Sequence, residues 1–359
     1  MIRRTLAFTA AVLLGLVVAG TAYWHYAAAR LSEGIAVWAE ERRAEGMDAT
    51  YSSLEVTGFP WLLRASVRDP VLARPERPAA ATGQTPGEGD EPAWAWRGSE
   101  LVAAFRPWRP RTLDLRFPGT HQITLPLDED GWTVFAAAAR ASGTLDLNSA
   151  GAPESGVFRA EDLDLVSEDG GASLAIARGN LAVSAYPPGA PRHLGTTLDL
   201  TFTGEDLDLP PDPEPPLGRR ISTLQATLSL LGVLPPGPLA EAAAEWRRDG
   251  GTVELHRLYL DWGPLEVEAG GTLALDAELQ PMGALTATIR GFAETIDALV
   301  AKGLVKARDG ATAKVVLGLL AKEPEGGGAP EVTVPLTVQN GRLYVGPVVL
   351  FRLPKVPWG

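Results

Sequence analysis

The stretch Leu265-Glu-Val-Glu-Ala-Gly-Gly-Thr-Leu-Ala-Leu275 decides the fold class, because apolar and polar residues alternate along it. The alternation extends over 252–291, where the apolar residues occupy odd positions: Leu265, Val267, Ala269, Leu273, Leu275, Ala277, Leu279, Leu285, Ala287 and Ile289. A period of two places successive side chains on opposite faces of a strand. We expect Gly270-Gly271 and Gln280-Pro-Met-Gly283 to supply the breaks. The segment predicts an antiparallel meander with one apolar and one polar face.

Further strands are expected on both sides of this meander. Gly58-Phe59-Pro60-Trp61 predicts a hairpin turn, since Gly and Pro set the backbone of turns. Asn340-Gly341 predicts a second, tight hairpin turn between strands at 331–338 and 342–350. The other predicted strands cover 94–126, 132–140, 143–209 and 221–230. Helical patterns are expected at 27–46, with Gly46 as its C-cap, and at 235–251, 292–305 and 309–322.

The predicted class is therefore mainly β (α+β). We expect an N-terminal transmembrane helix followed by a large curved antiparallel sheet with a few packing helices. The predicted parts are an anchor or uncleaved signal at 1–27, a helix plus a β half at 28–209, a Pro-rich connector at 210–218, and a meander, two helices and a C-terminal hairpin at 219–359. The first half contains an expected mobile loop at 74–92, and the last part is expected to continue the first.

The N-terminal run carries the prediction about location. No charged residue occurs from Thr5 to Tyr26, and a helix of that length reaches about 30 Å at about 1.5 Å per residue. Arg3-Arg4 precedes the run, which favours a cytoplasmic N-terminus. The aromatic residues expected at the membrane interface are Tyr23, Trp24 and Tyr26. We expect a single-pass inner-membrane protein with most of its chain in the periplasm.

A cleaved signal peptide is the alternative for the same run. Gly20-Thr21-Ala22 and Ala27-Ala28-Ala29 both have the small residues of a cleavage site. The aromatic residues lie where a cleavage region prefers small side chains, so a retained anchor is favoured.

Composition excludes several classes of protein. The 359 residues include no cysteine, so disulfides, thiolate nucleophiles and sulfur-ligated metals are ruled out. A net charge of −12 argues against nucleic acid as a partner. Hydrophobic residues make up 45% of the chain, which is enough to build a core.

No constellation of catalytic or ligand residues stands out, and we expect no catalytic residue, cofactor or metal. The four histidines are dispersed without metal-ligand spacing: His25, His121, His193 and His256. Neither a Gly-x-Ser-x-Gly elbow nor a Gly-rich phosphate loop occurs. Glu-Asp-Leu-Asp-Leu appears at 161–165 and again at 205–209. Calcium is one interpretation of these carboxylates, but without a Gly-centred ligand loop a solvated strand face is favoured.

Several short motifs follow the N-terminal apolar run in a fixed order: Tyr23-Trp24, a helix with Trp38, Gly58-Phe59-Pro60-Trp61, and the ending Asn340-Gly341-Arg-Leu-Tyr-Val-Gly346-Pro347. This order resembles an uncharacterised bacterial family, the domain-of-unknown-function family numbered 2125. The resemblance covers nearly the whole chain. More distantly, the meander, helices and terminal hairpin look like AsmA-like envelope proteins. That resemblance implies a membrane-anchored periplasmic sheet linked to phospholipid transport, although this chain is short for a trough that bridges two membranes.

The function expected from these patterns is non-enzymatic. An apolar sheet face must be covered by a second sheet, by helices or by an apolar ligand, because exposed apolar area costs about 25 cal/mol per Å². The few helices favour a sheet that holds lipid in an apolar groove, in a protein of the cell envelope. The alternatives are a solidly packed adaptor for another envelope protein and, third, a glycan-processing enzyme with two carboxylates in a cleft.

Overall fold

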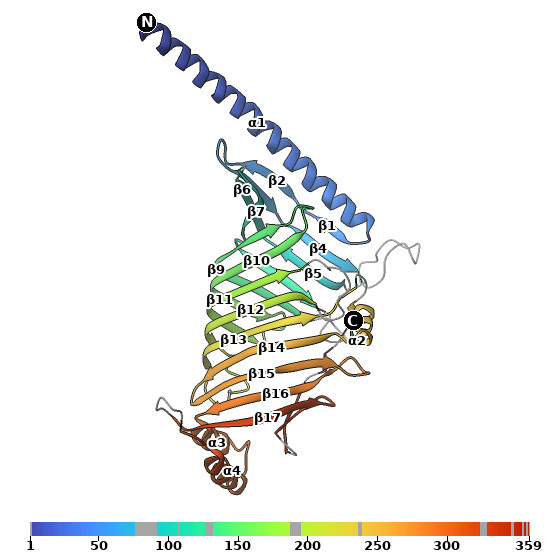
Figure 1. The fold of residues 1–359 in the computed structure, drawn as a ribbon, viewed down its shortest axis with the longest axis vertical. Helices are drawn as coiled ribbons and strands as arrows, with labels where there is room; N and C mark the ends of the chain where they lie inside the picture. The colour runs from blue at the N-terminus through green and yellow to red at the C-terminus, as the bar shows by residue number, and fades with distance from the viewer. Residues whose placement is uncertain are drawn as a thin grey trace. The chain divides into compact units, whose positions relative to one another are not determined.

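The computed structural model describes residues 2–75, 92–106, 108–125, 132–186, 195–235, 239–323, 329–345, 348–353, 355, 356 and 358. These residues form four helices and nineteen strands, and the strands pair in an antiparallel sense (Figure 1). The predicted mainly β class, with a large antiparallel sheet and few helices, is confirmed. Most of the loop predicted at 74–92 lies outside the described residues, while 74, 75 and 92 belong to strands.

The chain divides into two compact units. Unit 1 comprises 1–125 and 142–152, and unit 2 comprises 126–141 and 153–359. The Pro-rich connector predicted at 210–218 lies inside unit 2. It joins β12 (Thr196–Asp208) to β13 (Arg220–Leu231), and these strands pair directly with each other. The prolines therefore mark a connection within one sheet.

Unit 1 contains two series of paired strands. Its strands are β1 (Asp48–Thr50), β2 (Ser53–Thr57), β3 (Leu63–Arg68), β4 (Val71–Pro75), β5 (Pro92–Gly98), β6 (Glu100–Arg106), β7 (Arg109–Arg116), β8 (Thr120–Leu125) and the last residues of β9 (Trp132–Leu147). One series runs β2–β3–β6–β7 and continues to residues 142–146 of β9. The other runs β1–β4–β5–β8. The predicted hairpin at Gly58-Phe59-Pro60-Trp61 is confirmed as the β2–β3 connection.

Helix α1 (Ile2–Ala44) is continuous, so the segments expected as an anchor at 1–27 and a helix at 27–46 form one element (Figure 1). Its C-terminal cap is the predicted Gly46, whose φ is 81°. The Gly46 N–H donates to the Arg43 carbonyl at 2.9 Å and the Met47 N–H to the Arg42 carbonyl at 3.0 Å, which is a Schellman cap. Among the described residues, no helix combines the length and the apolar character needed to cross a membrane.

Unit 2 is built on a long meander in which each strand from β10 to β19 pairs with the next. The bounds not yet given are β10 (Pro153–Ser167), β11 (Ser173–Ala185), β14 (Thr252–Trp262), β15 (Leu265–Leu275), β16 (Pro281–Arg290), β17 (Glu331–Gln339), β18 (Arg342–Val345) and β19 (Val348–Arg352). The predicted meander at 252–291 is thus confirmed as β14 to β16. The strand expected at 132–140 is the beginning of β9.

The register of these strands aligns apolar residues across the sheet. One row of directly paired residues runs from β10 to β17: Phe158, Leu181, Phe202, Ala226, Leu258, Ala269, Ala287 and Val334. A neighbouring row runs from β11 to β18: Val183, Leu200, Leu228, Leu255, Gly271, Leu285, Leu336 and Val345. Because directly paired residues of antiparallel strands share a face, the two rows give unit 2 one continuous apolar face.

Two predictions about breaks are wrong. Gly270-Gly271 lies inside β15, whose neighbours approach too closely for a larger residue: a Cβ on Gly271 would lie 2.3 Å from the Ala284 carbonyl oxygen. The actual turns are at 263–264 and 276–280. The strand expected at 342–350 is two strands, β18 and β19, which pair with each other. Asn340-Gly341, with φ values of 52° and 64°, forms the predicted tight turn before β18.

The predicted helices of unit 2 are present as α2 (Leu239–Arg248), α3 (Phe292–Ala301) and α4 (Ala307–Leu320). One core cluster contains Ala287, Val332 and Val334, with Phe292 of α3 and Leu317 of α4 packed against it. Thus α3 and α4 pack on part of the apolar face, and α2 contributes to the site described next.

Candidate lipid-binding site

An apolar cavity of about 250 Å³ lies in unit 2 beside helix α2. Its lining includes Leu230 of β13, Val253 of β14, and Leu273 and Leu275 of β15. Helix α2 contributes Ala243 and Trp246, and Trp358 lines it from near the C-terminus. The remaining lining residues are Leu234, Ala274 and Pro281, so every side chain at the cavity is apolar. A concave surface lined only by apolar side chains suits an apolar ligand.

Trp246 holds helix α2 against the sheet. Its side chain is 4% exposed, and its indole N–H donates to the Leu231 carbonyl oxygen at 2.8 Å. Gly251 makes the approach possible, because a Cβ there would lie 2.2 Å from the indole ring. The N–H groups of Gly250 and Gly251 cap α2 by donating to the Arg247 and Trp246 carbonyls. With its single polar atom satisfied, the indole presents only apolar surface to the cavity.

The C-terminal segment forms another wall. The Gln280 side chain accepts a hydrogen bond from the Val356 N–H at 2.8 Å and donates to the Val356 carbonyl oxygen at 3.1 Å. The Trp358 indole N–H donates to the Leu279 carbonyl oxygen at 2.7 Å. Leu279 has a φ of 58° in the turn after β15, where the Asp276 carboxylate accepts from the Gln280 N–H. This turn therefore fixes the segment that carries Trp358.

A polar cluster of Ser229, Asp199 and His256 in unit 2 does not belong to the cavity lining. Ser229 donates to Asp199 at 2.5 Å and contacts His256 Nε2 at 2.7 Å. Tyr186 donates to the same Asp199 carboxylate, and this hydrogen bond is the main reason that the Tyr186 pKa lies above its usual value. In a hydrolase triad the histidine lies between serine and carboxylate. Here the serine lies between the two and is only 6% exposed, so the geometry differs from that of a catalytic nucleophile.

Carboxylates of the two acidic repeats, the residues of the calcium interpretation, form ion pairs with arginines. Glu161 pairs with Arg140, Glu205 with Arg178, and Asp208 with Arg220. The Arg220 hydrogen bond is the largest cause of the lowered pKa of Asp208. Asp162 and Asp206 both adopt a φ of 50°. Within the described ranges, no group of three or more acidic or histidine side chains has a metal-binding arrangement.

The predicted interface residues on α1 fall into two groups. Tyr23 and Tyr26 are 57% and 62% exposed, whereas Trp24 is 8% exposed. Trp24 packs with Ala28 and Leu63, and its indole N–H donates to the Leu62 carbonyl oxygen at 2.9 Å. A membrane-interface role stays a prediction for all three aromatic residues, and the structure adds a docking role for Trp24.

The described residues of the family-like motifs at 58–61 and 340–341 form turns in the structure. Gly58 adopts a φ of 102°, and a Cβ there would lie 2.6 Å from the Leu62 carbonyl oxygen. Phe59 and Trp61 project from the same turn with exposed side chains, and the Phe59–Pro60 peptide is cis. Asn340 and Gly341 form the β17–β18 turn described above. Gly346 and Pro347 lie outside the described residues.

One protein family matches residues 24–354, and its description is "Uncharacterized protein conserved in bacteria (DUF2125)". The chain belongs to this family. The resemblance to the bacterial family numbered 2125 is therefore confirmed over nearly the whole chain. No curated protein and no solved structure matches the chain. The likeness to AsmA-like proteins stays a prediction.

The sequence patterns do not predict the cavity. Its lining residues come from four strands (β13 to β16), the segment after β13, helix α2 and a position near the C-terminus. The available signals were Trp246 in a short amphipathic helix ending at Gly250-Gly251, and a tryptophan close to the end of the chain. Neither signal indicates that Trp246 and Trp358 line the same cavity.

Proposed function

We propose that this DUF2125 protein is a non-enzymatic, inner-membrane-anchored protein of the bacterial cell envelope that binds a lipid acyl chain in the unit 2 cavity. The observation that carries the proposal is a cavity of about 250 Å³ without a polar side chain in its lining. Pockets that enclose drug-sized ligands measure roughly 300–1,000 Å³. The cavity therefore suits part of an acyl chain, with the remainder lying along the sheet.

Membrane anchoring rests on the sequence of α1. The uncharged run from Thr5 to Tyr26 follows Arg3-Arg4, which is the charge arrangement of a helix inserted with its N-terminus in the cytoplasm. This orientation places the rest of the chain in the periplasm. The curvature expected of the sheet belongs to the same proposal, because a curved apolar face holds a chain-like ligand better than a flat one.

The proposal is tested on the full-length chain, purified from bacterial membranes in detergent. Native mass spectrometry with lipid extraction is expected to find phospholipid at near-stoichiometric amounts. Ala243→Leu introduces a larger side chain where Ala243 lines the cavity, and we expect bound lipid to fall severalfold. Ala244→Leu is the matched control, because Ala244 is the next residue of α2 and does not line the cavity. Equal lipid in all three proteins, or none in the wild type, would refute acyl-chain binding at this cavity.

A second candidate function is an adaptor that docks on another envelope protein. Helix α4 carries four exposed aliphatic residues: Val315, Val316, Leu319 and Leu320. Leu319 alone is 81% exposed, and clustered apolar side chains of this kind are typical of interaction surfaces. Leu319→Lys would abolish a partner complex while leaving lipid content unchanged, so the two functions are separable.

A further inference from the structure

A pocket in unit 1 is lined by three arginines and one aspartate, in a chain whose net charge is −12. It lies over β3, β6 and β7 and has a volume of about 80 Å³. Arg106 donates to Asp114 at 3.0 Å, so one arginine is neutralised. In the described part of the chain, Arg64 and Arg116 make no ion pair. The pocket therefore carries two uncompensated guanidinium groups.

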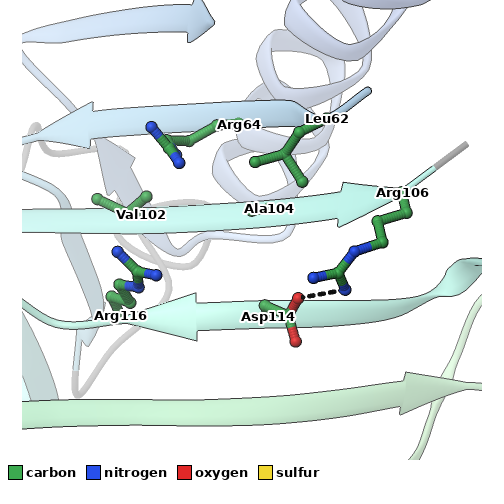
Figure 2. A pocket seen from close by; sticks show the side chains of 7 residues that line it. All are labelled: Leu62, Arg64, Val102, Ala104, Arg106, Asp114 and Arg116. Carbon is green, nitrogen blue, oxygen red and sulfur yellow. Dashed lines mark hydrogen bonds and ion pairs between the residues drawn. The ribbon is translucent and has the colours of Figure 1, made fainter. Parts of the chain in front are cut away.

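The strand register brings these two arginines together. Val102 of β6 pairs with Arg116 of β7 and with Ser66 of β3, and Arg64 is two residues before Ser66. Figure 2 shows the Arg64 and Arg116 guanidinium groups on the two sides of Val102, with the Arg106–Asp114 pair further along β6 and β7. Glu55 of β2 pairs with Ser66 and so lies on this face, yet it makes no ion pair with either arginine in the described structure.

The chemistry of the pocket selects a phosphate. Guanidinium groups present forked N–H donors that match phosphate oxygens, and they are less strongly hydrated than ammonium groups. The pocket volume of about 80 Å³ suits a small group such as a phosphate rather than a large ligand. The lining also includes the apolar side chains of Val102 and Ala104.

The neighbouring turn bears on what kind of molecule could reach the pocket. Leu62 lines the pocket, and its carbonyl accepts the hydrogen bond that docks Trp24. The preceding residue, Trp61, is 72% exposed, and Phe59 of the same turn is 50% exposed. Exposed aromatic residues beside a helix with an apolar run are typical of the head-group region of a bilayer.

We propose that Arg64 and Arg116 bind the phosphate of a membrane phospholipid head group, with Phe59 and Trp61 inserted beside it. This inference rests on the membrane placement in the proposed function, and it adds the chemical class of lipid recognised by unit 1. It does not depend on the acyl-chain cavity of unit 2.

The experiment uses the full-length chain in a phosphate-free maltoside detergent. Binding is measured by calorimetry with dihexanoyl phosphatidylglycerol, dihexanoylglycerol and inorganic phosphate as separate probes. We expect the phospholipid to bind, dihexanoylglycerol not to bind, and inorganic phosphate to bind at least tenfold more weakly than the phospholipid. Arg64→Gln and Arg116→Gln are each expected to weaken phospholipid binding about tenfold, because each removes charge-assisted hydrogen bonds.

Arg111→Gln is the matched control, because Arg111 lies on β7 with the opposite strand parity to Arg116 and does not line the pocket. It should change binding less than twofold. Arg64→Lys keeps the charge and the fold but loses the forked donor, and we expect an intermediate affinity.

Three results would overturn the inference: dihexanoylglycerol binding as well as the phospholipid, free phosphate binding as tightly as the phospholipid, or Arg111→Gln matching the pocket variants. Lipid content at the unit 2 cavity, measured on the same Arg64→Gln protein, separates the proposals. Retained acyl-chain lipid together with unchanged phospholipid affinity would refute the head-group site alone.

Discussion

Trp24 in unit 1 and Trp246 in unit 2 anchor a helix to a sheet in the same way, but they border different spaces. Both are buried, and each indole N–H donates to a backbone carbonyl, that of Leu62 at 2.9 Å and that of Leu231 at 2.8 Å. Trp246 lines an apolar cavity of about 250 Å³, whereas the pocket that includes Leu62 holds about 80 Å³ between arginines. The anchoring motif is shared, so the strand residues around it decide what each space can bind.

The largest expected effect tests whether the two anchors act separately. Trp246→Ala should lower the free energy of unfolding by about 3–5 kcal/mol, the usual cost of truncating a buried tryptophan. Hydrogen exchange of the full-length chain should then quicken in β13 to β15. Trp24→Ala should instead quicken exchange in β2 and β3. Faster exchange of both sets of strands in either variant would show that the anchors are not independent.

The next prediction has opposite signs in the two regions. Gly251→Ala should destabilise unit 2 by about 1–3 kcal/mol, because the new Cβ would overlap the Trp246 ring. Gly34 lies in the interior of α1, and a Cβ there would have no atom within 4 Å. Gly34→Ala should therefore stabilise the helix by up to about 1 kcal/mol. Denaturant unfolding of both variants measures the two shifts. A neutral Gly251→Ala would mean that Trp246 moves aside at little cost.

The glycines of the strands and turns show what sequence patterns can and cannot predict. The odd-position periodicity of 265–289 predicts β15 and β16 and their shared face, because strand geometry is a local property. The prediction of a break at Gly270-Gly271 is wrong because these glycines allow close approach between neighbouring strands, which depends on the register. Turn glycines such as Gly46 and Gly341 were assigned correctly, since left-handed backbone is also a local requirement.

Neither candidate site can be predicted from the sequence, because each brings together residues that are far apart in the chain. Arg64 and Arg116 are 52 positions apart and meet only because β3 and β7 both pair with β6. Trp246 and Trp358 line one cavity although two helices and six strands separate them in sequence. The hairpin containing Phe59 and Trp61 was predicted from its residues, but its position beside an arginine pocket depends on long-range pairing.

A smaller effect is expected at the wall of the apolar cavity. Gln280→Ala removes both hydrogen bonds to Val356, which should loosen the C-terminal segment by about 1–2 kcal/mol. The Trp358 indole should then exchange its N–H faster and become more accessible to a fluorescence quencher, while β2 and β3 remain unchanged. Gln225→Ala on β13 serves as the control, because Gln225 makes no contribution to the cavity lining. Unchanged Trp358 accessibility in Gln280→Ala would show that the segment is held by its indole alone.

The smallest effect concerns charge on the strands of unit 2. The Arg220 hydrogen bond, with smaller contributions from the Arg220 and Arg219 charges, lowers the pKa of Asp208 below its usual value. Because the pKa of Asp208 is lower in the folded chain than the unfolded value of about 3.9, its ionised carboxylate stabilises the fold above that pH. This stabilisation is lost as the pH falls through the lower folded-state pKa. Both side chains are more than one third exposed, so the contribution should stay below about 1 kcal/mol. Arg220→Gln should raise the Asp208 pKa toward its usual value in an NMR titration, and Arg219→Gln should raise it less. Equal shifts in the two variants would mean that general charge, rather than the Arg220–Asp208 hydrogen bond, sets the acid stability of this edge of β12 and β13.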